Sequence, residues 1–330
     1  MTLPAARASR AHGGSQAPAT LRTVAKLAGV SASTVSRVLN AGPGVGRCAS
    51  PATTTRIRAI ATQVGYVPNP HAASLRTHRS NLIGVLVPRL SDLVLATIYE
   101  GIEEAAAAAG YHTFVANSRD RPEEQRACVE MLLSRRADWL ILGDAYADAR
   151  FVDELAAREV PVVLVSRRAG NHPSVTCDDE LGGRLAAEHL LSLGHRRVGV
   201  IAGEPYASTG IDRTAGFVTT YAAAGFPVPA DLVIHSQFDV AGGRRAAEQL
   251  MAHDRIPTAI FAVNDFAAIG TLGAIRDSGA VAGRDIAVVG YNDIPLAAEL
   301  PISLPTIRSP THQMGYRAAE LLVSRSPVRR

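Results

Sequence analysis

From Asn81 onward, short apolar runs alternate with longer stretches of helical periodicity, and this alternation constrains the fold more than any other feature of the sequence. The predicted strands are residues 82–87, 112–116, 139–142, 161–165, 197–201, 232–235, 259–263 and 286–289. The predicted helices between them are residues 93–109, 123–136, 149–158, 181–193, 217–224 and 243–252. Repeated strand–helix units form parallel sheets that are covered by helices on both faces. The strands are too many for one such unit, so we expect two α/β lobes, with a ligand cleft between them at the carboxyl ends of the strands.

The first 80 residues differ in charge from the rest of the chain. They contain ten Lys or Arg residues and no Asp or Glu, a net charge of +10, and the first acidic residue is Asp92. The remaining residues hold 24 bases and all 30 acids, a net charge of −6, although the whole chain is only +4. A small cationic segment on an anionic body is typical of nucleic-acid-binding proteins. On charge alone, a basic tail that only aids solubility is the alternative.

The basic segment has the pattern of three short helices rather than of a tail. Thr20 and Ser31 are predicted N-caps of the first two helices, Gly29 ends the first, and Ser50-Pro51 begins the third. The apolar positions of the three helices are Leu21, Val24, Leu27 and Ala28, then Val35, Val38 and Leu39, then Ile57, Ile60 and Val64. Two short helices that meet at a tight glycine turn are typical of a helix-turn-helix head.

The second helix has the properties of a recognition helix. Its small and polar residues, with one long guanidinium at Arg37, share the face opposite its apolar positions. A guanidinium bonded to guanine through two hydrogen bonds contributes about 1–3 kcal/mol of discrimination. The predicted DNA-contacting residues of the head are Thr20, Ser31, Ala32, Ser33, Thr34, Ser36, Arg37 and Asn40.

Residues 24–31, VAKLAGVS, and residues 33–40, STVSRVLN, resemble the reading head of the lac repressor (LacI/GalR) family, and the similarity continues through GYVPN at 65–69. The resemblance implies that a hinge helix follows, in which Leu75 would insert between base steps of the minor groove. The alternative for Leu75 is a linker residue that packs on the body. Two departures from the family are a longer loop at 41–49, which contains Cys48, and Ala73 where many relatives carry Arg.

The body resembles the same family, whose effector domain is similar to periplasmic sugar-binding proteins. The stretches that carry the resemblance are EHL at 188–190, LGHRR at 193–197, RTAGF at 213–217, AVND at 262–265 and VGYND at 289–293. The predicted effector-binding residues are Asp92, Ser166, Arg213, Phe238, Asn264 and Asn292. Asn292 stands where many relatives have Asp.

Structural roles for these residues are the alternatives to effector binding. Arg213 could pair with Asp293, Phe238 could be core, and Asn264 with Asp265 could cap a helix. His189 and His195 are interpreted as structural residues near a helix end rather than as ligands or catalysts.

The resemblance predicts a small all-α helix-turn-helix domain and an α/β two-lobed body with parallel sheets flanked by helices. Residues 1–19 are expected to be a disordered basic arm, 20–68 the DNA-binding domain, 69–80 the hinge helix and linker, and 81–330 the effector-binding and dimerisation domain. Within the last, one lobe would comprise 81–175 and 309–322, and the other 176–305. The expected protein is a cytoplasmic, homodimeric repressor that binds a palindromic operator and is controlled by a sugar or sugar derivative, without cofactor or metal.

Two other functions are less favoured by the sequence. Lys26 is the only lysine, so no phosphate-binding loop ending in Gly-Lys-Ser/Thr is present, and the common dinucleotide, zinc-protease and nucleophile-elbow motifs are absent. An α/β enzyme is therefore disfavoured. A sugar-binding protein without DNA activity would have no need of an acid-free helix-turn-helix segment. The three cysteines are too few and too widely spaced for a disulfide framework or a metal site, and no apolar run is long enough to span a bilayer.

Overall fold

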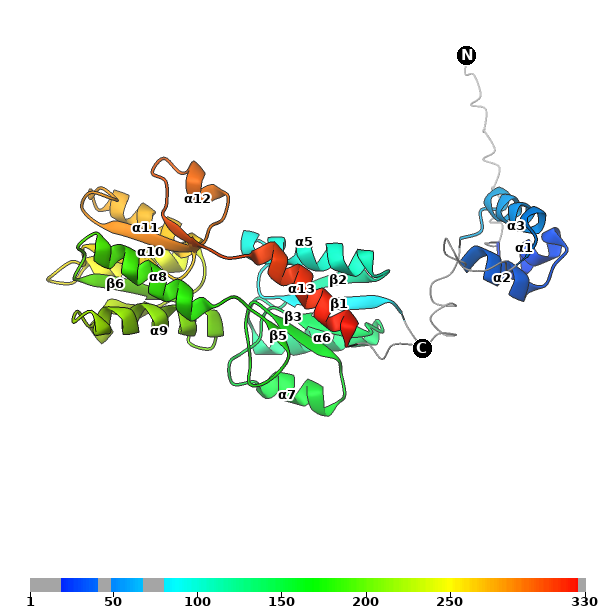
Figure 1. Ribbon diagram of the computed structural model, residues 1–330, viewed down its shortest axis with the longest axis horizontal. Helices are drawn as coiled ribbons and strands as arrows, with labels where there is room; N and C mark the ends of the chain where they lie inside the picture. Colours follow the sequence, from blue (N-terminus) through cyan, green and yellow to red (C-terminus); the bar gives the residue numbers. More distant parts are fainter. Residues whose placement is uncertain (1–18, 41–48, 68–79, 326–330) are drawn as a thin grey trace, which may run out of the picture. The chain divides into compact units, whose positions relative to one another are not determined.

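The computed structural model describes residues 19–40, 49–67 and 80–325, and the chain divides into two compact units, residues 1–78 and 79–330 (Figure 1). We call the unit of residues 1–78 the head and the unit of residues 79–330 the body. Leu75, the hinge helix and most of the long loop predicted at 41–49 lie outside the described residues.

The described part of the head contains α1 (Leu21–Ala28), α2 (Ala32–Asn40) and α3 (Pro51–Gln63). Thr20 begins α1 with a capping box, in which its Oγ1 accepts from the Thr23 amide at 3.2 Å and its own amide donates to Thr23 Oγ1. Gly29 ends α1 with a φ of 63°, a left-handed conformation that glycine adopts without strain. The core of the head is Val24, Ala25, Ala28, Val35, Val38, Ile57 and Ala61. Leu27, predicted to be on the apolar face of α1, is 57% exposed.

The body contains two parallel sheets of five strands each. The first has the order β2-β1-β3-β4-β5 and the second the order β10-β9-β8-β6-β7. The strands of the first lobe are β1 (Leu82–Val87), β2 (His112–Asn117), β3 (Trp139–Leu142), β4 (Val162–Val165) and β5 (Ser174–Val175). Those of the second lobe are β6 (Val198–Ala202), β7 (Val233–His235), β8 (Ala259–Ala262), β9 (Ala287–Asn292) and β10 (Thr306–Arg308).

Helices cover both faces of each sheet (Figure 1). Those of the first lobe are α5 (Leu93–Ala108), α6 (Pro122–Ser134), α7 (Arg150–Ala157) and α13 (Thr311–Ser324). Those of the second are α8 (Asp179–Ser192), α9 (Ser208–Ala223), the 3₁₀ turn η1 (Ala230–Leu232), α10 (Val240–Met251), α11 (Asp265–Asp277) and α12 (Leu296–Glu299). The chain enters the second lobe between β5 and α8 and returns between β10 and α13, which packs along α5.

Each sheet is buried on both sides because successive strand residues face opposite directions. In β1, Ile83, Val85 and Val87 belong to the cluster beneath α5 and α13, whereas Leu86 belongs to the cluster beneath α6 and α7. The predicted fold class is confirmed. The edge strands β5 and β10 and the helices α11, α12 and α13 were not predicted, and α9 begins at Ser208 rather than near Phe217. The first three residues of α9 have low intrinsic helix propensity; they are Ser208, Thr209 and Gly210. These residues are helical because tertiary burial outweighs their low propensity.

Candidate functional site

The face of α2 that was predicted to contact DNA is held by a short hydrogen-bond network at its first turn. Ser31 Oγ accepts from the Thr34 amide at 3.2 Å and lies 2.8 Å from Ser33 Oγ and 2.9 Å from Thr34 Oγ1. Ser33 and Arg37 are exposed, and Arg37 Nε lies 3.4 Å from the Ser33 carbonyl oxygen one turn earlier. The structure therefore brings the cap and the guanidinium onto one accessible surface.

Several of the predicted DNA-contacting residues are not fully exposed or lie partly outside the described structure. Ala32 is half-buried and packs against the core of the head, so only part of it faces outward. Ser36 is half-buried on the same helix. Asn40 is the last residue of α2, and its side chain lies outside the described part of the structure.

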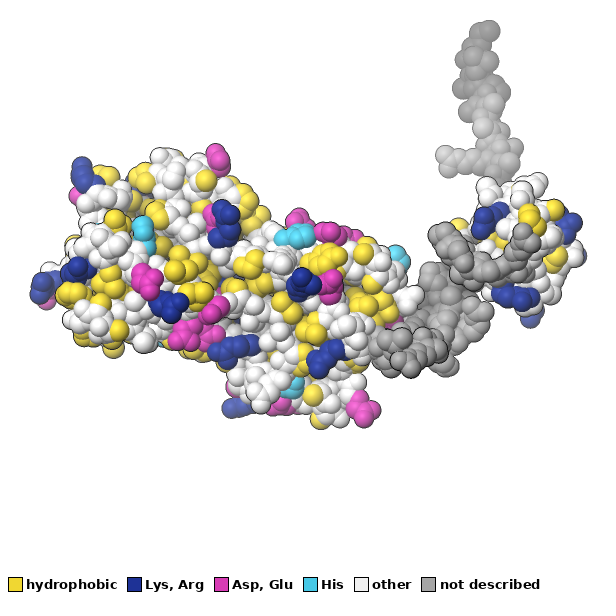
Figure 2. Space-filling view, viewed as in Figure 1, with side chains coloured by type: hydrophobic (Ala, Val, Ile, Leu, Met, Phe, Trp, Pro, Cys, Tyr) yellow, Lys and Arg dark blue, Asp and Glu magenta, His cyan; other side chains and the backbone are white. Residues whose placement is uncertain are grey.

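The head has basic side chains and no acidic ones. The exposed basic side chains of the described head are Arg22, Lys26, Arg37, Arg56 and Arg58. The sequence has no Asp or Glu before Asp92, so these side chains have no acidic partner inside the head. Figure 2 shows dark blue side chains and no magenta ones on the visible face of this unit. The head therefore has a positive electrostatic potential that attracts the phosphates of nucleic acid.

A cavity of about 290 Å³ lies between the two lobes of the body, at the carboxyl ends of the strands. All six residues that were predicted to bind the effector line this one cavity. Asp92 and Ser166 come from the first lobe, and Arg213, Phe238, Asn264 and Asn292 come from the second.

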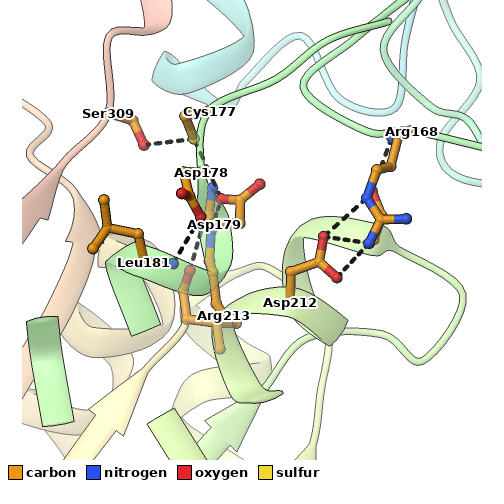
Figure 3. A network of polar contacts seen from close by, with 10 residues as sticks. Arg168, Cys177, Asp178, Asp179, Leu181, Asp212, Arg213 and Ser309 are labelled. Carbon is orange, nitrogen blue, oxygen red and sulfur yellow. Dashed lines mark hydrogen bonds and ion pairs between the residues drawn. The ribbon is translucent and has the colours of Figure 1, made fainter. Parts of the chain in front are cut away.

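Arg213 is buried on α9 and is bound by an acidic partner (Figure 3). Its Nε donates to Asp179 Oδ1 at 2.7 Å, its Nη1 donates to the Val263 carbonyl oxygen at 2.8 Å, and the guanidinium lies 3.7 Å from the centre of the Tyr291 ring. Burial alone would lower the pKa of Arg213, but Asp179 and Tyr291 raise it, so the guanidinium stays charged. The alternative of an ion pair between Arg213 and Asp293 is wrong, because Asp293 pairs with Arg308 at 2.7 Å.

The side chains of the two asparagines on the cavity wall differ in their hydrogen bonding. Asn264 Oδ1 accepts from the Ala267 amide at 2.9 Å, and Nδ2 donates to the Phe238 carbonyl oxygen at 3.0 Å, so this side chain caps α11. Asn292 has a φ of 112°, and its Oδ1 is buried without a hydrogen-bond partner. A buried acceptor without a donor costs free energy, which a ligand hydroxyl or amine would recover.

Asp92 is the N-cap of α5 and lines the cavity. Its Oδ1 accepts from the Val94 amide at 2.9 Å. Burial raises the pKa of Asp92 to about 6, although the Val94 amide and the arginines at 89, 167 and 213 oppose the shift. Near neutral pH this carboxylate is ionised and can accept further hydrogen bonds.

Several residues of the cavity wall were not identified from the sequence. Arg167 is buried, binds both oxygens of Asp120 through Nη1 and Nη2 at 2.7 and 2.8 Å, and lies 5.6 Å from the Phe238 ring and 5.8 Å from the Tyr206 ring. Arg167 lies two residues after the end of β4, at the carboxyl end of a predicted strand, and that position could have identified it. Nothing in the sequence connects it with Asp120, 47 residues earlier.

The described residues also bear on metal binding and on membrane insertion. No group of three or more His, Cys, Asp or Glu there is arranged to hold a metal ion. Among the helices described, none combines the length and the apolar character that crossing a membrane requires.

An acid-free helix-turn-helix head and a two-lobed body around a cavity define a DNA-binding protein with a body of the periplasmic-binding-protein type. Residues 20–69 match the profile of bacterial regulatory proteins of the lacI family, and residues 80–327 match that of periplasmic binding proteins and the sugar binding domain of the LacI family. The chain belongs to the LacI family, and it is a DNA-binding transcriptional regulator rather than an enzyme.

Named relatives extend over nearly the whole chain. The transcriptional repressor PurR of Photobacterium profundum is 32% identical over 310 residues, which are 93% of this chain and 92% of that protein. The regulator DegA of Bacillus subtilis is 31% identical over 301 residues, covering 90% and 88%. Among solved structures, the lac repressor dimer bound to operator and the anti-inducer ONPF has a TM-score of 0.83 at 29% identity, covering 93% of this chain and 92% of that chain. The complex of the regulator CelR with cellobiose has a TM-score of 0.70 at 30% identity, covering 93% of each.

Proposed function

We propose that the protein is a repressor whose affinity for a palindromic operator is controlled by a sugar or sugar derivative bound between the two lobes. The observation that carries the proposal is that six side chains chosen from the sequence, separated by up to 200 positions, line one cavity. The aromatic ring of Phe238, the free acceptor of Asn292 and the carboxylate of Asp92 match the apolar face and the hydroxyl donors of a sugar. The structures of relatives hold ONPF and cellobiose.

The ligand would act by its different affinity for two arrangements of the lobes. It can shift the operator affinity only by the factor by which it prefers one arrangement. In this proposal, Arg37 reads a base edge, and the caps Thr20 and Ser31 lie near phosphates, with Leu75 in the minor groove.

A thermal-shift screen of mono- and disaccharides on the full chain tests the ligand class. A ligand at 100 times its Kd stabilises the folded state by about 2.7 kcal/mol. The stabilising sugar is then added to the protein on an operator selected from random DNA, and the operator affinity is expected to change at least several-fold. Asn292→Leu should abolish the thermal shift, whereas Arg244→Gln, outside the cavity, should keep it. No stabilising sugar, or one that leaves operator binding unchanged, contradicts the proposal.

Arg37→Ala tests the recognition helix. We expect the variant to lose about 10- to 100-fold of its preference for the selected operator over unrelated DNA, because one bidentate base contact contributes about 1–3 kcal/mol. Competition binding at fixed salt measures the ratio, and Arg58→Ala on α3 is the matched control. A variant that still selects the same sequence would exclude this role of Arg37.

The proposed homodimer matches a palindromic operator, since a two-fold protein reads two equivalent half-sites. The relative solved with its operator is a dimer. In the second lobe, an apolar groove of about 400 Å³ beside α11 supports association with a second copy of the chain. Its apolar residues include Ile269, Leu272, Val281, Leu300, Pro301 and Ile302. Sedimentation that finds only monomer at micromolar concentration would contradict the dimer.

A further inference from the structure

Three arginines of the first lobe reach across to the second lobe. Arg89, after β1, donates through Nη1 to Asp239 Oδ2 at 2.7 Å. Arg168, after β4, donates through Nε and Nη2 to the carboxylate of Asp212 at 2.7–3.1 Å (Figure 3). Between them in sequence, Arg167 places its guanidinium against the rings of Tyr206 and Phe238. All three arginines therefore emerge after the carboxyl ends of first-lobe strands. Arg89 and Arg168 form ion pairs with second-lobe carboxylates, whereas Arg167 forms its ion pair with Asp120 of its own lobe and contacts the second lobe only through the two rings.

Neutral contacts accompany the arginines. The Ala147 amide donates to the Tyr206 carbonyl oxygen at 2.9 Å, and the Arg168 amide donates to Ser208 Oγ at 2.9 Å. The rings of Tyr146 and Tyr206 stack with their centres 4.4 Å apart. Each of these contacts joins one lobe to the other through protein atoms alone, so separation of the lobes must break them.

The carboxylate of Asp239 is held by its own helix as well as by Arg89. Asp239 caps α10, because its Oδ1 accepts from the Gly242 amide at 2.7 Å and leaves Oδ2 for Arg89. Asp212 lies in the second turn of α9 and is 20% exposed. Partners held in place lose little side-chain entropy when the pair forms, and a fork of hydrogen bonds is the strongest geometry for such a pair.

The ion pair of Arg168 lies away from the covalent connections between the lobes. In Figure 3, it is separated by Arg213 from the place where Cys177 and Ser309, on the two crossover segments, approach each other. The crossovers tie the lobes on one side, and the arginine contacts tie them elsewhere around the cavity.

We propose that Arg89, Arg167 and Arg168, together with their second-lobe partners, form an arginine clamp that keeps the lobes closed independently of any effector. An effector then acts on a body that is already biased towards closure. The clamp does not depend on the identity of the ligand or on DNA binding. Experiments can therefore refute the clamp and leave the proposed function standing, or refute the proposed function and leave the clamp standing.

The amide of Ala147 reports the clamp directly, because its hydrogen bond crosses between the lobes. Hydrogen exchange of the ligand-free full chain, resolved to single amides by fragmentation mass spectrometry, is compared for wild type and Arg89→Gln/Arg168→Gln. Half-exposed ion pairs each shift an equilibrium by up to about five-fold, so we expect exchange at Ala147 to be about three- to ten-fold faster in the double variant. Exchange at Ile141, in the core strand β3, is the internal reference.

Two variants separate the clamp from a general loss of charge. Arg158→Gln removes an arginine that pairs with Glu130 inside the first lobe, and it should leave Ala147 unchanged. Arg168→Asp combined with Asp212→Arg exchanges the two charges and should restore slow exchange at Ala147, whereas Arg168→Asp alone should not. Equal exchange in wild type and the double glutamine variant, or faster exchange in Arg158→Gln, overturns the proposal.

Ionic strength supplies an independent measurement. Raising the salt from about 0.05 to about 0.5 M screens half-exposed ion pairs, so exchange at Ala147 should accelerate in wild type and much less in the double variant. Wild-type exchange that does not respond to salt would show that the stacked tyrosines, and not the arginines, hold the lobes.

Discussion

Asp92 combines a helix cap with a place on the cavity wall. Its Oδ1 accepts from the Val94 amide, and a carboxylate has further lone pairs that can accept hydrogen bonds from a ligand. Burial raises the pKa of this carboxyl from 3.8 to about 6, which means that the folded state binds the proton more tightly than the unfolded state. The folded state is therefore favoured at low pH, and this contribution is lost as the pH rises from about 4 to about 6.

Asp92→Asn should remove this pH dependence without removing the cap, because asparagine is also a good N-cap. We expect the variant to be more stable than wild type by about 1–2 kcal/mol at pH 7–8, with partial exposure limiting the gain, and equal to it below pH 4. Urea unfolding of the body between pH 4 and 8 measures the difference. Asp178→Asn is the matched control, since Asp178 caps α8 with an exposed carboxylate. A difference in unfolding free energy between Asp92→Asn and wild type that does not vary with pH would refute the raised pKa of Asp92 as its cause.

At the scale of residues, the sequence predicted the cavity better than it predicted the partners within it. Arg213 and Asn292 were identified because they lie in the stretches RTAGF at 213–217 and VGYND at 289–293, which resemble the family. The partner of Arg213 is Asp179, at the start of a different helix, and only the packing of α8 on α9 brings the two together. Asn264 shows a further limit, because one side chain both caps α11 and lines the cavity, and its sequence motif fits both roles.

At the scale of elements, three helix pairs of the body cross at reciprocal glycines. On α8 and α9, a Cβ added to Gly183 would lie 2.0 Å from the Arg213 carbonyl oxygen, and one added to Gly216 would lie 2.0 Å from that of Glu180. The pairs α5 with α13 and α10 with α11 show the same arrangement. The backbones approach closely because no side chain separates them. On α8 and α9, this contact sets the distance between Asp179 and Arg213.

Gly216→Ala should destabilise the body although alanine favours the helix. The gain in helix propensity is about 1 kcal/mol, whereas forcing a methyl group against the opposite backbone costs about 1–3 kcal/mol or separates the helices. Gly273→Ala in α11 is the matched control, because its Cβ would meet only the end of the flexible Arg244 side chain. We expect thermal unfolding at a lower temperature for Gly216→Ala and at an unchanged or higher one for Gly273→Ala. Equal shifts of the unfolding temperature in both variants would contradict the close backbone contact of α8 and α9 as the cause of the destabilisation.

Sequence patterns predicted elements where the local preference agrees with the tertiary structure. The strands β1, β3 and β8 are short, wholly apolar runs and were found nearly to the residue. The first turns of α9 contain Ser, Thr and Gly, which have low helix propensity, so their helical state depends on burial that the sequence does not display. The two-residue strand β5 is an edge strand whose only strand partner is β4, so no local pattern marks it.

At the scale of the whole molecule, charge separates the two units more clearly than any other property. The head has only basic side chains, which repel one another, and it has no internal ion pair that could offset the repulsion. Salt shortens the range of this repulsion from about 10 Å at 0.1 M to about 3 Å at 1 M. Salt should therefore stabilise the folded head while it weakens the binding of DNA.

These opposite effects of salt can be measured on the full chain. Hydrogen exchange at the buried amides of Val35 and Ile57 should slow several-fold between about 0.05 and 0.5 M salt, since local unfolding of the head becomes less favourable. Operator affinity over the same range should fall with a log–log slope of about −0.9 for each phosphate that the head neutralises. The five exposed basic side chains of the described part of the head account for a slope of about −4 to −5 per head, and the nine Lys and Arg residues among residues 1–78 limit it to about −8. A head that loses protection as salt rises, or an operator affinity that ignores salt, would refute the electrostatic basis of both effects.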